Sequence, residues 1–232
     1  MLQAHDTRRS IWPILAALVV SLAAIIATTP YAHAAVGKLK LSKSSRLPDI
    51  LVMTWRGEVR PGMAKVIRAA FDKYKDRFHV IELILDSPGG SVHEGEKVIA
   101  VLQQIKKTHR LITIVMPGKR CGSMCPFIYM QGQKRFAAPA SIWLFHEVSR
   151  SDKRTHKIYE LDRAQWESLI EKYWLPAGVN PVWIAEMKTH TFQSDYYQTG
   201  QDLLDHDSGI VHKPLSDEMR RKVVPKETAH QP

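Results

Sequence analysis

Short apolar runs alternate with helix-like patterns through the middle of the chain. Three runs, Ile50–Thr54, Val80–Leu85 and Leu111–Met116, are almost entirely apolar and predict buried strands. Between them, apolar residues recur at helical spacing, first at Val66, Ile67, Ala70, Phe71 and Tyr74, and then at Val98, Val101, Leu102 and Ile105. This β-α-β-α-β order predicts an α/β fold with a mostly parallel sheet and right-handed crossovers.

The sequence changes character after one more apolar run. Ser141–Phe145 predicts a strand that ends at His146, and the chain beyond it is polar with two helical patterns. The first pattern places Trp166, Leu169, Ile170 and Tyr173 on one face of a long helix. The second begins at Asn180-Pro181 and runs to about His190, and Gly209–Val211 predicts a last short strand.

The length of 232 residues suits one well-buried domain rather than two. We expect this domain to cover residues 49–212. Residues 35–48 are polar and basic and predict a flexible lead-in, while residues 213–232 are charged and flanked by prolines and predict a disordered tail.

The first 34 residues have the order of parts found in a secretory signal peptide. Arg8 and Arg9 precede the uncharged apolar stretch Ile11–Ile26, Pro30 follows it, and Ala32-His33-Ala34 is a small-residue cleavage motif. We therefore expect cleavage near Ala34 and a periplasmic or secreted protein. The alternative is an uncleaved N-terminal membrane anchor.

Composition and charge narrow the function classes. The chain is 44% hydrophobic and 24% charged, as in globular proteins, and its net charge is +10. The basic residues form only short clusters without interleaved aromatic residues, so we expect no nucleic-acid partner. Export separates the protein from ATP and coenzyme A, so we expect no cofactor. No metal is expected, because Arg150 interrupts an H-E-x-x-H pattern that would begin at His146-Glu147.

Polar and glycine-rich residues follow three of the predicted strands. They are Asp86–Gly90, Gly118–Ser123 and His146, and functional residues gather at the carboxyl ends of parallel strands. Ser123 after Gly122 suits a nucleophile on a sharp turn into a helix. The alternative is an ordinary helix-capping serine.

Several of these segments together resemble the Clp protease proteolytic subunit family. The resemblance is carried by the segments Leu85–Val92, Gly95, Gly122–Met124, Gly132–Ser141 and His146, which agree in order, spacing and residue type. It implies a ClpP-like, crotonase-like fold built as a spiral of β-β-α units. Two departures are that cysteines bracket Ser123, and that no glycine-rich run follows His146.

The resemblance also implies site roles. Ser123 matches the family nucleophile and His146 its histidine base. Gly90 and Met124 match the two backbone donors of the oxyanion hole.

The third catalytic residue and the base both have alternatives. Asp195 matches the family acid, and Asp202 and Asp205 are its rivals. Exported relatives of this fold use a serine–lysine dyad, for which Lys119 and Lys134 are candidates.

Cys121 and Cys125 lie on either side of Ser123. Export favours oxidation, so we expect a disulfide that stiffens the serine turn, and we hypothesise that its reduction acts as a switch. The alternative is two buried free thiols.

These observations favour an exported serine peptidase or acyl hydrolase that acts on a peptide or protein. The alternative is an inactive ClpP-like module that binds peptides or serves as a scaffold; a crotonase-like acyl transferase is a third, weaker interpretation. We expect a homo-oligomer, with contacts on the apolar faces Trp166–Trp174 and Trp183–Met187, and no ATP-dependent unfoldase as partner.

Overall fold

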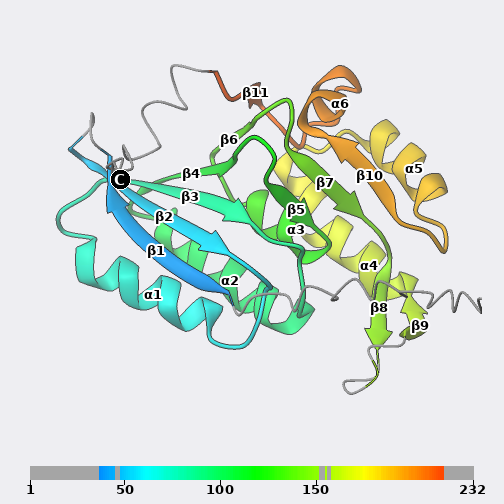
Figure 1. The fold of residues 1–232 in the computed structure, drawn as a ribbon, viewed down its shortest axis with the longest axis horizontal. Helices are drawn as coiled ribbons and strands as arrows, with labels where there is room; N and C mark the ends of the chain where they lie inside the picture. Colours follow the sequence, from blue (N-terminus) through cyan, green and yellow to red (C-terminus); the bar gives the residue numbers. More distant parts are fainter. Residues whose placement is uncertain (1–36, 45–47, 152–154, 156–157, 217–232) are drawn as a thin grey trace, which may run out of the picture. The chain divides into compact units, whose positions relative to one another are not determined.

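A computed structural model describes residues 37–44, 48–151, 155 and 158–216. Its main sheet has the strand order β1-β2-β3-β4-β6-β11 (Figure 1). The strands are β1 (Lys38–Lys43), β2 (Ile50–Arg56), β3 (Val80–Asp86), β4 (Arg110–Val115), β6 (Lys134–Ala137) and β11 (Lys213–Pro214). Only the β1–β2 pair is antiparallel within this sheet, so the predicted mostly parallel α/β fold is confirmed.

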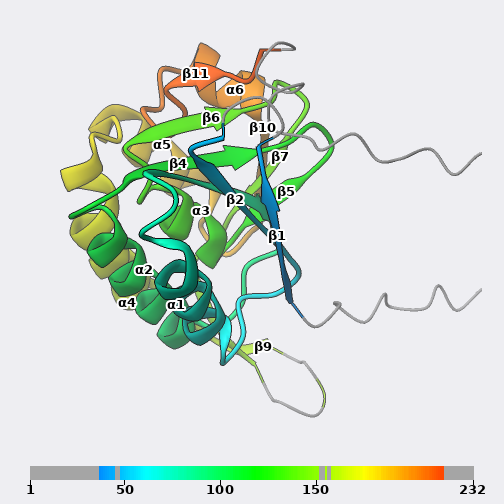
Figure 2. The ribbon, with the colours of Figure 1, turned by 90° about the vertical axis from the view of Figure 1, so that its left-hand side faces the viewer.

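The two predicted helices are α1 (Met63–Tyr74) and α2 (Val92–Ile105). They lie on one side of the main sheet (Figure 2). Their apolar stripes are buried with alternate residues of β3, such as Leu83 and Leu85, in one hydrophobic core. The intervening Ile84 belongs to a smaller apolar cluster on the opposite face, as the two-residue period of a strand requires.

A second, three-stranded sheet has the order β10-β7-β5. It contains β10 (Tyr196–Thr199), β7 (Ile142–Phe145) and β5 (Arg120–Gly122), and β5 leads into α3 (Met124–Tyr129). A bridge between Ser87 and Cys121 joins β5 to the end of β3. The apolar pattern did not reveal β5, because it has three residues and contains Arg120 and Gly122.

The region after His146 differs from the prediction. A hairpin of β8 (Val148–Ser151) and β9 (Ile158–Asp162) stands where helical structure was expected. The expected long helix is broken into α4 (Arg163–Leu169), the π-helical turn η1 (Ile170–Trp174) and the 3₁₀ turn η2 (Leu175–Ala177). The helix predicted after Asn180 is confirmed as α5 (Pro181–His190), and α6 (Gly200–Asp205) follows β10.

Two predictions at the margins of the domain were wrong. Lys38–Lys43 forms β1 rather than a flexible lead-in, because Leu39 and Leu41 alternate with lysines and pack against the core. The last strand is Lys213–Pro214, which pairs with β6, and not Gly209–Val211. The signal or anchor segment and most of the predicted tail lie outside the described residues. No helix of the described part is long and apolar enough to cross a membrane.

The expected oligomer contacts are also corrected. Trp166, Trp174, Trp183 and Met187 are at most 2% exposed and belong to the core. Trp174 stacks on Phe127 of α3 with ring centroids 4.6 Å apart. These apolar faces close the core of this chain, so they are not free to contact another copy.

Candidate active site

Ser123 forms the turn between β5 and α3. Its backbone has φ 55° and ψ −111°, outside the regions that non-glycine residues ordinarily adopt. The Ser123 N–H donates to the carbonyl of Leu144 at 2.9 Å, while its side chain makes no capping hydrogen bond to α3. The structure therefore does not support the interpretation of Ser123 as an ordinary cap.

The two glycines after Pro88 allow this turn to be approached closely. A Cβ on Gly89 would lie 2.4 Å from Cβ of Ser123, and one on Gly90 would lie 2.5 Å from the Val59 carbonyl oxygen. Both glycines also have positive φ, 98° and 139°. A side chain at Gly89 would collide with Ser123, and a side chain at Gly90 would collide with Val59.

The backbone around Gly90 and Met124 leaves two donors free. Two hydrogen bonds hold the glycine turn against Val59. The Val59 N–H donates to the Gly89 carbonyl, and the Ser91 N–H donates to the Val59 carbonyl. Within the described residues, neither the Gly90 N–H nor the Met124 N–H has an acceptor. Two unpaired N–H groups beside Ser123 are what an oxyanion hole requires.

The three-stranded sheet carries the candidate base His146 and the candidate acid Asp195 near Ser123. β5 pairs in parallel with β7, with Gly122 opposite Leu144, so Ser123 and His146 both follow strands at one end of this sheet. β10 pairs antiparallel with β7, with Tyr196 opposite Phe145. This register brings Asp195, one residue before β10, level with His146, one residue after β7.

The side chains of the three residues are not hydrogen-bonded to one another in the part of the chain that the structure describes. His146 Nδ1 is instead hydrogen-bonded to the backbone oxygen of Glu147, and Asp195 is exposed. A carbonyl oxygen only accepts, so the bonded Nδ1 must carry the proton. In the neutral ring, Nε2 is then left as an acceptor.

The rival acids have other partners. The Asp202 carboxylate accepts from the Thr199 N–H at 2.7 Å and from its hydroxyl at 2.8 Å, which caps α6 and lowers the pKa of Asp202. Asp205 accepts from the Gln201 amide at 2.8 Å. Of the three acids, Asp195 alone is brought level with His146 by the β7–β10 register.

The two candidate lysine bases are poorly placed. Lys119 Nζ lies 3.3 Å from a carboxylate oxygen of Asp86 and is held in that ion pair. Lys134 begins β6, at the amino end of the main sheet. The Ser123 turn lies instead beyond the carboxyl end of β3, where Ser87 binds β5. Neither lysine is a better candidate base than His146.

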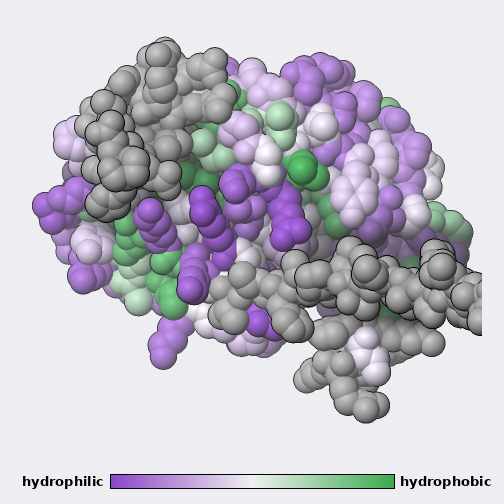
Figure 3. Space-filling model, in the orientation of Figure 1, coloured by the Kyte–Doolittle hydropathy of each residue, from purple (hydrophilic) through white to green (hydrophobic). Residues whose placement is uncertain are grey.

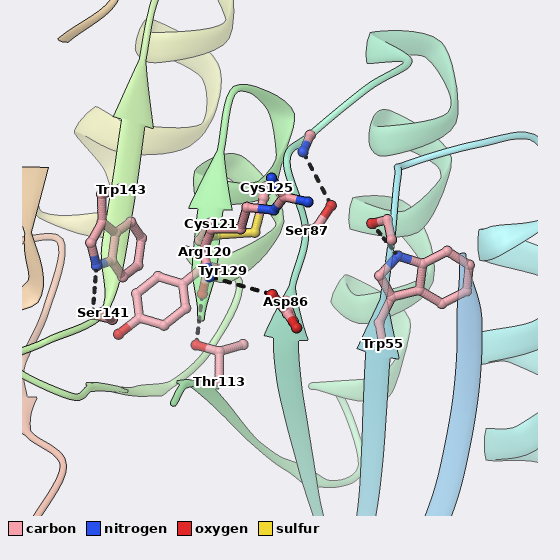
Figure 4. Close-up of a disulfide and its surroundings, with 12 residues drawn as sticks. Trp55, Asp86, Ser87, Thr113, Arg120, Cys121, Cys125, Tyr129, Ser141 and Trp143 are labelled. Atoms are coloured by element: carbon pink, nitrogen blue, oxygen red, sulfur yellow. Dashed lines mark hydrogen bonds between the residues drawn. A yellow bond between two sulfur atoms is a disulfide. The ribbon is translucent and has the colours of Figure 1, made fainter. Parts of the chain in front are cut away.

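A disulfide crosses the Ser123 turn. The sulfur atoms of Cys121 and Cys125 lie 2.02 Å apart, and both residues are fully buried. Figure 4 shows this link between β5 and α3, near Ser87 and Tyr129. It closes a ring that contains Ser123 and Gly122.

Comparison with known proteins decides the family. The family model described as Clp protease matches residues 40–164, which is more than half of the chain. The chain belongs to the Clp protease family. A ClpP1 mutant from Listeria monocytogenes has a similar fold, with a TM-score of 0.54, 16% sequence identity, and coverage of 71% of this chain and 91% of that one. No curated protein matches the sequence.

This member of the Clp protease family carries one contact near the site that the sequence did not suggest. Glu147, directly after His146, is buried, and its Oε1 lies 3.2 Å from Arg163 Nε. The Arg163 guanidinium lies 5.1 Å from the ring centroid of Phe192, three residues before Asp195. Arg163 thus bridges the segments that carry the candidate base and acid, which are far apart in sequence.

The described residues of this Clp protease domain gather no group of three His, Cys, Asp or Glu side chains suited to hold a metal ion.

Proposed function

We propose that this chain is an exported serine hydrolase that cleaves peptides or proteins through Ser123, His146 and Asp195. One observation carries the proposal. The register of β5, β7 and β10 brings a serine, a histidine and an acid to one end of a small sheet. Membership of the Clp protease family supports the same reaction class.

Each of these residues has one role in the proposed reaction. Ser123 Oγ attacks the substrate carbonyl carbon while His146 Nε2 takes its proton. The Gly90 and Met124 N–H groups stabilise the oxyanion. His146 then gives the proton to the leaving amine, and water hydrolyses the acyl-enzyme. Asp195 stabilises the imidazolium, which requires that it replace the Glu147 carbonyl as partner of His146 Nδ1.

Covalent labelling tests the nucleophile. We expect a fluorophosphonate probe to label the wild-type chain at Ser123 and to leave Ser123→Ala unlabelled. Ser149→Ala, which removes a half-buried serine hydroxyl from β8, is the matched control and should label like the wild type. An unlabelled wild type, or equal labelling of Ser123→Ala, would count against catalysis.

A second candidate function is a peptide-binding or scaffold module that has lost catalysis. The hydrogen bond of His146 to Glu147, rather than to Ser123 or Asp195, is the observation that favours it. Under this alternative the folded protein binds peptides and does not react with the probe at any pH between 6 and 9.

Export is a separate part of the proposal and has its own test. When the gene is expressed in a bacterium, we expect the chain in the periplasmic fraction or medium, with a mass that corresponds to a start at Ala35. A full-length chain that remains in the membrane fraction would favour the anchor instead. Labelling of Ser123 does not depend on which outcome is found.

A further inference from the structure

Four cationic side chains from two separate segments line one cavity at the amino ends of β4 and β6. The cavity measures about 390 Å³, and its walls are Lys106, Lys107, Thr108, His109, Arg110, Gln133 and Lys134. Residues 106–110 link α2 to β4, and residues 133–134 lead into β6. Pairing of Ile112 with Lys134 brings these segments side by side. The fold thus brings Lys134 beside the three bases of residues 106–110.

The side-chain acceptors of this cavity are already occupied. The Thr108 hydroxyl and His109 Nδ1 lie 2.7 Å apart, and His109 Nε2 lies 2.9 Å from the Lys75 carbonyl oxygen. Nε2 must therefore donate to that carbonyl, and in the neutral ring Nδ1 accepts from Thr108. The Gln133 Oε1 atom accepts from the Leu111 N–H at 2.9 Å. A ligand therefore meets few free acceptors on these walls.

The donors, in contrast, are free. Among the described residues, no ion pair or side-chain hydrogen bond engages Lys106, Lys107, Arg110 or Lys134. Lysine and arginine side chains only donate. The cavity therefore offers positive charge and N–H groups to a ligand that only accepts.

The charge behind the cavity is also uncompensated. The buried Arg135 guanidinium binds backbone carbonyls, with distances of 2.8 Å to both Ile210 and Gly209, and no carboxylate among the described residues faces it. Burial and the charge of Arg135 lower the pKa of Lys106. A bound anion would offset this repulsion between like charges.

We propose that this cavity binds a phosphate-type oxyanion, either free or as the phosphate group of a larger molecule. Such a group carries several acceptor oxygens and a charge near −2, which matches converging lysine and arginine donors. The cavity lies at the amino end of the parallel strands, away from the Ser123 turn. Binding there is independent of the proposed hydrolase activity.

The test compares two variants of equal charge. Lys106→Gln, Lys107→Gln and Lys134→Gln together remove three bases from the cavity. Lys38→Gln, Lys40→Gln and Lys43→Gln together remove three exposed bases from β1 and serve as the control. Calorimetry measures affinity for inorganic pyrophosphate, and sedimentation measures binding to phosphatidylglycerol vesicles, with phosphatidylcholine vesicles as reference.

We expect the cavity variant to lose at least tenfold in affinity while the β1 variant stays within about twofold of wild type. Pyrophosphate binding alone identifies a small soluble oxyanion. Vesicle binding that pyrophosphate displaces identifies a lipid headgroup. The proposal is overturned if neither probe binds the wild type, or if both variants lose affinity equally, since overall charge then explains the result.

Discussion

At the scale of single residues, Glu82 stands apart because it is a buried acid in an apolar surrounding. It lies on β3 between Val52 and Ile112, and it is 7% exposed. Its Oε2 atom has no hydrogen-bond partner among the described residues. Burial raises the pKa of Glu82 to about 7, since a carboxylate there loses its hydration without gaining a partner.

Glu82 should therefore make stability depend on pH. An acid with a raised pKa keeps its proton to a higher pH in the folded state than in the unfolded state. The free energy of unfolding therefore falls as pH rises from about 4.5 through 7. Above that range the ionised group costs about 3 kcal/mol. We expect Glu82→Met to raise the urea midpoint at pH 8.5 and to raise it much less at pH 4.

Glu171→Met, which changes an exposed acid on η1, is the control for the Glu82 experiment. It should leave the difference in urea midpoint between pH 8.5 and pH 4 the same as in the wild type. If Glu82→Met raised the urea midpoint equally at pH 8.5 and at pH 4, the explanation by a buried acid would be contradicted.

Much of the candidate site was predictable at this scale, although its geometry was not. The order of Gly90, Ser123 and His146 after strands was visible in the sequence. The positive φ of Ser123 was not, because it arises where β5 is held between Ser87 and β7. Such long-range pairing leaves no periodic signal in a strand of three residues.

At the scale of elements, the disulfide joins β5 to α3 across Ser123. The ring it closes is short, so the chain-entropy model gives a stabilisation of about 2 kcal/mol. Because both cysteines are fully buried, a reductant has no direct access to them in the folded protein.

We expect the Cys121→Ser, Cys125→Ser double variant to lose about 2 kcal/mol in free energy of unfolding. We also expect its Ser123 to react more slowly with the fluorophosphonate probe, because the turn is less constrained. The native wild type should show no titratable thiol in reductant until denaturant is added. Rapid reduction of the folded protein, with a matching change in labelling, would instead support the hypothesis of a redox switch.

The elements missed from the sequence share a physical cause. β1 has only two apolar residues, Leu39 and Leu41, so its alternation is too short to distinguish from a polar linker. The β8–β9 hairpin and β5 owe their form to pairing rather than to local apolar pattern. The longer runs, such as Val80–Asp86, are buried on both faces of the sheet and were unambiguous.

At the scale of the whole molecule, Trp166, Trp174 and Trp183 are buried in the core. Contacts between copies of the chain must therefore use other residues. Val182 and Trp183 are neighbours on α5, yet Val182 is 75% exposed and Trp183 is 2% exposed. Adjacent substitutions can therefore separate folding from assembly.

We expect Trp183→Ala to lower the free energy of unfolding by about 3–5 kcal/mol. Val182→Glu should leave the unfolding free energy unchanged and, for an oligomer assembled through α5, should reduce the mass measured by light scattering. Loss of stability in Val182→Glu would contradict the exposure of this position. An unchanged mass would direct the search to other exposed apolar residues, of which Tyr197 on β10 is one.

The lysines of β1 have a consequence for how this protein behaves at high concentration. β1 is the last strand of the main sheet, so one row of its backbone groups has no neighbouring strand among the described residues. Lys38, Lys40 and Lys43 are exposed along it, and Figure 3 shows hydrophilic residues beside apolar ones over this region. A strand from another molecule would have to bring its backbone beside these charges. The lysines that made β1 hard to recognise in the sequence thus oppose aggregation through the β1 edge of the sheet.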